Sequence, residues 1–244
     1  MNGGGFVTWV RTEPPPSTDE HPFALPVVRE LFARGGLGLD PGVTFLVGDN
    51  GSGKSTLLEA LAVVFGMNLE GGSRDFRFST HPERSALAEH LVARWKRRPR
   101  ADFFLRAESF HNAVTYVEGL PGGAMVASGA GSLHERSHGE GFLDVALHRF
   151  RPDGLYLLDE PEAALSVRGC LALLRRVADL RGKRCQFVIA THSPVLLALP
   201  GALILQIDED GALEPTGYDE ADPVRLTRGF LADPQRSLRE LLTD

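Results

Sequence analysis

The residues best suited to chemistry lie in one glycine-rich loop, residues 48–55, which reads Gly-Asp-Asn-Gly-Ser-Gly-Lys-Ser. The loop fits the pattern G-x-x-x-x-G-K-[S/T] and lies between an apolar run and a helical pattern, the context that this motif requires. Glycines let backbone N–H groups turn inward around phosphate oxygens, and the following helix points its positive end at the same anion. A glycine-rich turn that matches by chance is the alternative. We expect a phosphate site formed by Gly48, Asn50, Gly51, Ser52, Gly53, Lys54, Ser55 and Thr56.

A pair of acids is the second candidate for chemistry. The apolar run 155–158 ends in Asp159 and Glu160. A carboxylate at the end of such a strand lies beside a metal ion at the phosphate loop, and we expect Asp159 and the Ser55 hydroxyl to hold Mg²⁺. Lys54 is expected to reach the terminal phosphates, and Glu160 to orient and deprotonate an attacking water. The alternative is two solvated acids at a strand end.

Short apolar strands that alternate with helices must position these residues. Apolar runs predict strands at 43–47, 102–107, 155–158 and 187–190, a hairpin at 203–213 and an edge strand at 6–10. Apolar residues at helical spacing predict helices at 55–65, 82–98, 141–150, 166–181 and 236–242. The alternation indicates a mostly parallel sheet covered on both faces, with ligands at the carboxyl ends of its strands.

Composition limits the class of protein. The chain has 244 residues, of which 43% are apolar and 24% charged, the balance of one globular domain with a sizeable core. This balance excludes a disordered, a collagen-like or a coiled-coil chain as the main content. The formal charge of −6 argues against a protein that coats nucleic acid, because such a protein would be basic.

No feature of the sequence predicts a membrane or secreted location. The N-terminal residues lack a basic region followed by an apolar core, and polar residues and prolines interrupt the apolar window 187–207. Cys170 and Cys185 have no C-x-x-C partner, so they form neither a disulfide framework nor a zinc knuckle. We therefore expect a cytoplasmic protein with reduced thiols and without an integral membrane segment.

The motifs, in this order, resemble those of the ATP-binding-cassette (ABC) ATPase family. Residues 159–166, Asp-Glu-Pro-Glu-Ala-Ala-Leu-Ser, are similar to its Walker B motif and D-loop, and residues 191–194, Thr-His-Ser-Pro, to its switch-histidine segment. Residues 137–141, Ser-His-Gly-Glu-Gly, occupy the place of its signature motif. The chain looks most like compact stand-alone AAA-family ATPases related to the head domains of SMC and RecF proteins.

The resemblance implies a fold and a domain organisation. The fold is an α/β P-loop NTPase of RecA-like type, with a mostly parallel sheet flanked by helices, an N-terminal antiparallel β element and a small helical lobe. We expect a single ABC-type ATPase domain over residues 1–244. Its core lobe covers about 1–80 and 143–244, and its helical lobe, which carries the signature, about 81–142.

The resemblance also implies a mechanism. Two copies pair head to tail, and each ATP with its Mg²⁺ lies between the phosphate loop of one copy and the signature of the other. Ser137 and the backbone of Gly139 would bind the partner's γ-phosphate. His192 would contact the γ-phosphate in its own copy and position Glu160 or the attacking water. The implied catalytic residues are therefore Glu160, His192 and Lys54.

Two departures from the family pattern affect the expected contacts. The signature has His138 where the family has glycine and Glu140 where it has glutamine. The family also uses a glutamine between the phosphate loop and the signature, and this chain has none from 57 to 185. Glu108 follows a predicted strand at that place, where it either helps to order the Mg²⁺ shell, beside Ser55 and Asp159, or is a plain structural acid.

Other interpretations of the sequence stay open. Residues 134–138 spell H-E-x-x-H, the zinc metalloprotease motif, but glycines on both sides argue against the helix that this chemistry needs. The basic segment 94–100 is either a contact for nucleic acid or an acidic protein partner, or a solvated helix end. Phe23 and Phe32 are candidates to stack on adenine or ordinary core aromatics. An ATPase subunit of an ABC transporter is the alternative function.

Overall fold

The computed structural model describes residues 5–15, 20–68, 85–107 and 138–243. Within the last range, the side chains of residues 138–140 are not described. Three of the expected features therefore lie outside the described residues: Glu108, Ser137 and most of the H-E-x-x-H segment.

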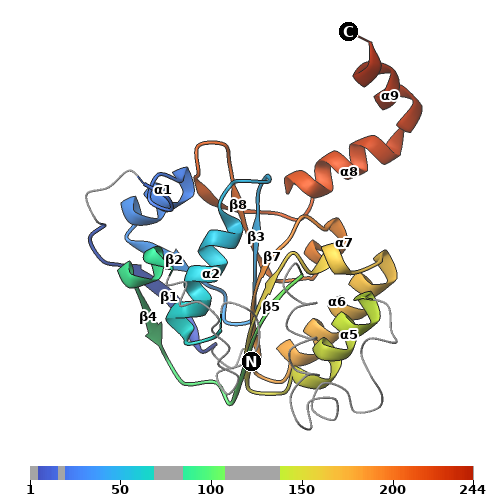
Figure 1. Ribbon diagram of the computed structural model, residues 1–244. Coiled ribbons are helices and arrows are strands. Elements are labelled where there is room, and N and C mark those ends of the chain that lie inside the picture. Colours follow the sequence, from blue (N-terminus) through green and yellow to red (C-terminus); the bar gives the residue numbers. More distant parts are fainter. Residues whose placement is uncertain (1–4, 16–19, 69–84, 108–137, 244) are drawn as a thin grey trace.

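A six-stranded sheet forms the centre of the molecule (Figure 1). Five of its strands are parallel, and the last is antiparallel to its neighbour. Burial on both faces explains why these strands read as continuous apolar runs, and it confirms the expected mostly parallel α/β sheet. Across the sheet, the strands are β5 (Ala101–Arg106), β6 (Gly154–Asp159), β7 (Gln186–Ala190), β3 (Val43–Val47), β8 (Leu203–Ile207) and β9 (Leu213–Thr216).

The strand order brings three loops together. Strand β7 lies between β3, which leads into the phosphate loop, and β6, which ends in Asp159. Because β3, β6 and β7 are parallel, their carboxyl ends meet at one edge of the sheet. The phosphate loop, the acids after β6 and the histidine after β7 therefore converge there.

A second, three-stranded antiparallel sheet packs beside the first. It consists of β1 (Val7–Thr12), with β2 (Gly36–Gly38) on one side and β4 (Leu91–Trp95) on the other. This sheet is the expected N-terminal β element, although β1 is its central strand and not an edge strand. The helix predicted over 82–98 is wrong, because residues 86–90 form the 3₁₀ helix η1 (Ala86–His90) and β4 follows directly.

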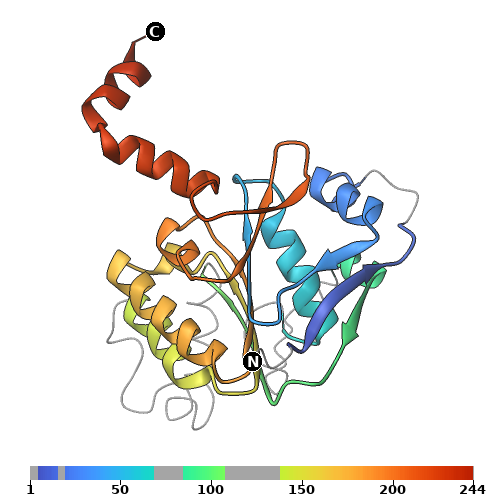
Figure 2. The ribbon, with the colours of Figure 1, turned by 180° about the vertical axis from the view of Figure 1, so that it is seen from behind.

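Helices cover both faces of the central sheet (Figures 1 and 2). On one face, α1 (Pro26–Ala33), α2 (Lys54–Phe65) and the three-stranded sheet enclose one apolar core. On the other face, α5 (His138–Arg149), α6 (Val167–Arg181) and α7 (Pro194–Leu197) enclose a second core. The stacked rings of Phe150 and Tyr156, with centroids 4.4 Å apart, lie in this second core.

One buried side chain ties the two sheets together. The Gln186 side chain, which is wholly buried at the start of β7, accepts hydrogen bonds from the backbone N–H groups of Phe6 and Val7 at 2.8 and 3.0 Å. Its amide group donates to the carbonyl oxygens of Val7 and Asp40 at 2.5 and 2.9 Å. A buried amide with all these partners fixes the position of β1 against the central sheet.

The last two helices extend away from the body of the molecule (Figures 1 and 2). They are α8 (Asp222–Ala232) and α9 (Pro234–Leu242), and α9 has no buried residue. Helix α9 confirms the predicted terminal helix. Helices α1 and α8 were not predicted, although each has a proline in its first turn, which is a helix-start signal.

The basic segment 94–100 does not end a helix. It begins with the last two residues of β4 and leads into β5, and two of its arginines make structural contacts. The Arg97 guanidinium lies 4.0 Å from the Phe6 ring centroid and donates to Asp153 at 2.9 Å, while that of Arg98 lies 4.1 Å from the Trp95 ring centroid. These contacts give the two arginines a packing role.

Candidate functional site

The phosphate loop has the backbone that a phosphate cradle needs. Gly51 and Gly53 adopt φ angles of +83° and +93°, in the left-handed region that other residues rarely occupy. A Cβ atom on Gly53 would lie 2.6 Å from Cγ1 of Val27, so no larger side chain fits against α1. The buried Ser52 Oγ has no hydrogen-bond partner within the described residues, which leaves this hydroxyl for a ligand on the loop.

The amino end of α2 adds a second contribution to anion binding. The helix has no side-chain cap, and its first intrahelical bond runs from Leu57 N–H to Gly53 carbonyl. The N–H groups of Lys54, Ser55 and Thr56 therefore precede that first bond. Together with the helix dipole, they form the kind of site that binds phosphate oxygens.

The Lys54 side chain is held inside the loop. It is 3% exposed, and its Nζ donates to the carbonyl oxygens of Gly48 and Asp49 at 2.8 Å each. An ammonium group has three N–H donors. The two hydrogen bonds hold the group in place and leave the third N–H for a ligand. Burial lowers the pKa of Lys54, and the charges of the nearby acids, led by Glu160 and Asp159, oppose that shift. The acids thus favour the cation that a phosphate needs.

Ser55 and Asp159 meet as the sequence predicts. The Ser55 hydroxyl donates to Asp159 Oδ1 at 3.1 Å, and Arg106 Nε lies 3.4 Å from Asp159 Oδ2. Arg106, at the end of β5, also donates to Glu59 on α2 at 2.5 Å. Burial raises the pKa of Asp159 to about 6, although the positive charge of Arg106 and the Ser55 hydrogen bond oppose this rise.

These oxygen donors fit Mg²⁺. A hydroxyl and a carboxylate lie side by side, and both are the hard ligands that this ion prefers. Within the described residues no group of three or more His, Cys, Asp or Glu side chains forms a metal site. Mg²⁺ in phosphate sites commonly takes one or two protein ligands and completes its shell with substrate phosphates and water.

Glu160 and His192 lie next to each other at the same edge. Glu160 follows β6 with φ of +46°, a rare conformation for a residue with a side chain, and its N–H donates to Ala190 carbonyl at 3.0 Å. His192 follows β7, and its Nε2 lies 3.5 Å from Glu160 Oε1. Both side chains are partly exposed, at 32% for His192 and 40% for Glu160, although the His192 Nε2 atom itself is buried and has no hydrogen-bond partner within the described residues.

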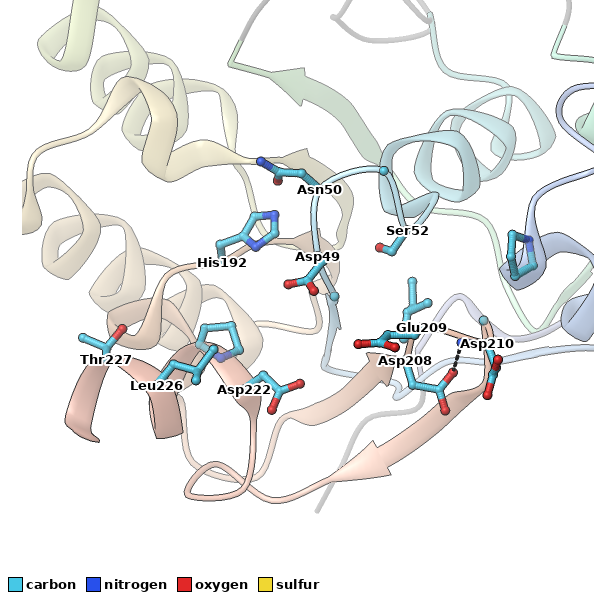
Figure 3. A pocket seen from close by; sticks show the side chains of 16 residues that line it. Asp49, Asn50, Ser52, His192, Asp208, Glu209, Asp210, Asp222, Leu226 and Thr227 are labelled. Atoms are coloured by element: carbon cyan, nitrogen blue, oxygen red, sulfur yellow. Dashed lines mark hydrogen bonds between the residues drawn. The ribbon is translucent and has the colours of Figure 1, made fainter. Parts of the chain in front are cut away.

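A pocket of about 870 Å³ opens beside the phosphate loop (Figure 3). The loop residues Asp49, Asn50 and Ser52 lie between His192 on one side and the turn 208–210 on the other. The start of α8 completes the wall with Asp222, Pro223, Leu226 and Thr227. The phosphate loop thus faces an open, partly acidic space large enough for a nucleotide-sized ligand.

The predicted site residues divide into those that the structure brings together and those that it does not describe. The set that converges comprises Gly48, Asn50, Gly51, Ser52, Gly53, Lys54, Ser55, Thr56, Asp159, Glu160 and His192. Glu108 and Ser137 lie outside the described residues, so their roles stay predictions. Gly139 and Gly141 lie within α5, which starts at His138, three residues before the predicted start.

Sequence reasoning missed three residues at the edge. Arg106 and Glu59 flank Asp159, and Glu162 accepts a hydrogen bond from the His192 N–H. Of these three residues, only Glu162 could have been found from the sequence, because it is part of the Asp-Glu-Pro-Glu segment. Phe23 packs with Phe32 and His90, at centroid distances of 6.1 and 5.5 Å, and is 8% exposed. These contacts favour the core interpretation of that aromatic pair.

Comparison with known proteins agrees with this geometry. A family described as "AAA domain, putative AbiEii toxin, Type IV TA system" matches residues 77–198, half of the chain. The chain belongs to this AAA-domain family. A second family, described as "AAA domain", matches residues 32–104 of this AAA-domain protein.

A curated relative and two solved structures are similar to this AAA-domain protein. The DNA replication and repair protein RecF of Stenotrophomonas maltophilia (strain R551-3) is 30% identical over 151 residues, which cover 54% of this chain and 40% of RecF. The SMC head domain from Thermotoga maritima is 18% identical, with a TM-score of 0.43, over 75% of this chain and 93% of that one. The structure of cbiO1 from Clostridium perfringens, part of the ABC transporter complex cbiONQ, is 15% identical, with a TM-score of 0.46. The match covers 96% of this chain and 99% of cbiO1.

The family, the motifs and the strand order together identify a P-loop ATPase domain of the AAA family. Within the described residues, no helix is long and apolar enough to cross a membrane.

Proposed function

We propose that this AAA-domain protein is a Mg²⁺-dependent ATPase that hydrolyses ATP between two head-to-tail copies of itself. The observation that carries the proposal is the convergence of Lys54, the Ser55–Asp159 pair and the Glu160–His192 pair at one sheet edge. These groups match the needs of phosphoryl transfer to water, which are phosphate binding, charge neutralisation and a base.

Each residue has a separate task in the proposed reaction. Lys54 and the amino end of α2 bind the β- and γ-phosphates. Ser55 and Asp159 hold Mg²⁺, which neutralises phosphate charge when bound. Glu160 accepts a proton from the attacking water, and His192, 3.5 Å away, orients Glu160 against the γ-phosphate.

The second copy is proposed to complete the site with Ser137 and the backbone of Gly139. The start of α5 at His138 supports this proposal, because a helix amino end at the signature would direct its positive dipole toward the partner's γ-phosphate. Glu108 is proposed to assist the Mg²⁺ shell from the segment after β5.

The cycle is proposed to act as a conformational switch in DNA repair, DNA maintenance or defence. The relative named as a DNA replication and repair protein supports the first two roles, and the toxin named in the family description supports the third. Both cysteines are unpaired and buried, which supports a reducing, cytoplasmic location. Identification of the protein or DNA that co-purifies with the ATP-bound Glu160→Gln variant distinguishes these roles.

The phosphate site is tested by calorimetric titration of ATP into Lys54→Ala. We expect tight binding to disappear, because the variant loses the buried cation that faces the phosphates. Lys183→Ala, at an exposed position in the turn between α6 and β7, is the matched control and should bind ATP as the wild type does. Wild-type affinity in Lys54→Ala would refute the assignment of the phosphate loop.

A further inference from the structure

Glu162 lies in the turn that follows the proposed general base. This turn is the 3₁₀ helix η3 (Pro161–Ala164), which starts immediately after Glu160. Glu162 Oε1 accepts a hydrogen bond of 2.5 Å from the backbone N–H of His192, 30 positions along the chain. The side chain therefore links the turn after β6 to the loop after β7.

The contact completes a series of bonds that define the His192 loop. The Thr191 N–H donates to Leu46 carbonyl at 3.1 Å, and the Ser193 N–H donates to Thr191 Oγ1 at 3.0 Å. Between them, the N–H of His192 has passed the end of the β7 ladder, and Glu162 supplies its acceptor. A charged acceptor makes a stronger bond than a neutral one, so Glu162 restrains the backbone that carries the His192 ring.

This restraint acts on the distance between His192 and Glu160. The two side chains are 3.5 Å apart, and Glu160 itself is held by its N–H bond to Ala190 carbonyl. Release of the His192 backbone would let the ring move while Glu160 stays in place. Misplacement of a catalytic group by about 1 Å can cost about 10²-fold in rate.

We propose that Glu162 is a positioning residue, which holds His192 in register with Glu160 through the His192 N–H. The proposal rests on the proposed ATPase function of that pair. The Glu162 hydrogen bond goes to the His192 backbone and not to the phosphate loop, so we expect Glu162 to act on turnover and not on ATP binding.

Three substitutions separate the hydrogen bond from the charge. Glu162→Gln keeps an oxygen acceptor without the charge, Glu162→Asp keeps the charge without the reach, and Glu162→Ala removes both. We expect kcat to fall about tenfold or more in the alanine and aspartate variants and to stay within about threefold of wild type in the glutamine variant. The dissociation constant for ATP should change by no more than about twofold in each. Asp179→Ala, at an exposed acid on α6, is the matched control and should leave kcat unchanged.

A second measurement does not depend on catalysis. Amide hydrogen exchange at His192, followed by NMR, should be slow in the wild type and in Glu162→Gln, and about tenfold or more faster in Glu162→Ala and Glu162→Asp. If this pattern appears but the wild type hydrolyses no ATP, the proposed function fails and the restraint by Glu162 stands. Equal exchange in all four proteins, or an equal loss of kcat in the glutamine and alanine variants, overturns the proposal.

Discussion

The Ser55 hydroxyl donates a 3.1 Å hydrogen bond to Asp159, although the two residues lie 104 positions apart in the chain. Ser55 is in the first turn of α2, and Asp159 is the last residue of β6. The bond joins the two halves of the proposed Mg²⁺ site across the intervening strand β7. The sheet topology therefore brings together the two residues of the proposed Mg²⁺ site.

Asp159→Asn should stabilise the fold when Mg²⁺ and nucleotide are absent. The native fold raises the pKa of this carboxyl from 3.8 to about 6, so the ionised form costs stability above that pH. The cost is fully present above about pH 6 and disappears below about pH 4. We expect the variant to gain about 1–3 kcal/mol at pH 8 and little at pH 4, by urea unfolding with a chelator. A loss of stability at pH 8 would mean that the Ser55 and Arg106 contacts outweigh desolvation.

Asp153→Asn, in contrast, should lower the stability of the fold at neutral pH. Hydrogen bonds from Arg184, and then from Arg97, hold the pKa of Asp153 well below its usual range. The resulting stability is present above the unfolded pKa near 4 and is lost as the pH falls further. The variant should therefore be less stable than wild type at pH 7, and the difference should shrink below pH 4. Asparagine also tolerates the φ of +60° at this position, so backbone strain does not confuse the comparison.

Gln186→Met should lower the free energy of unfolding, because it removes the hydrogen bonds that join the two sheets. Methionine fills a similar volume but leaves the N–H groups of Phe6 and Val7 and two carbonyl oxygens without their side-chain partner. We expect a loss of about 3 kcal/mol or more in the free energy of unfolding, measured in urea. A loss below about 1 kcal/mol would show that water replaces these hydrogen bonds without penalty.

A mixing experiment tests the proposed shared site. Ser137→Arg blocks the signature face by bulk, and Lys54→Ala disables the phosphate loop, so each homodimer should be inactive. In the heterodimer both defects fall in one site and the other stays whole. Random mixing makes about half the dimers mixed, so roughly a quarter of wild-type ATPase activity should return if the sites are independent. Light scattering should also detect a mixed dimer with ATP. A mixture with neither recovered activity nor a mixed dimer would contradict the head-to-tail model.

Local signals were sufficient where one element alone decided the outcome. The run Val43–Val47 matches β3 in full, and α2 ends at Gly66, whose φ of +82° fits a helix C-cap. The acids and the histidine that follow strands lie where parallel strands must place them. The family pattern added the pairing of Glu160 with His192.

Sequence signals failed where the spacing was ambiguous or where a contact spans the fold. Leu91 and Trp95 are four residues apart, and such residues share one face in a helix and also in a strand. Residues Leu91–Trp95 form a strand because they pair with β1, and no local sequence feature predicts that pairing. Arg106 reaches Asp159 only because β5 and β6 are neighbours, with Arg106 in register with Asp159.

The most direct test of the proposed function is ATP-dependent phosphate release by the wild type and by Glu160→Gln, with Mg²⁺ present. The amide keeps the shape of the carboxylate but cannot accept a proton from water. We predict steady hydrolysis by the wild type and a turnover that is about 10²-fold or more lower in the variant, with ATP binding retained. Equal turnover in the two proteins, or no Mg²⁺-dependent hydrolysis by the wild type, would contradict the assignment of Glu160 as the base of an ATPase.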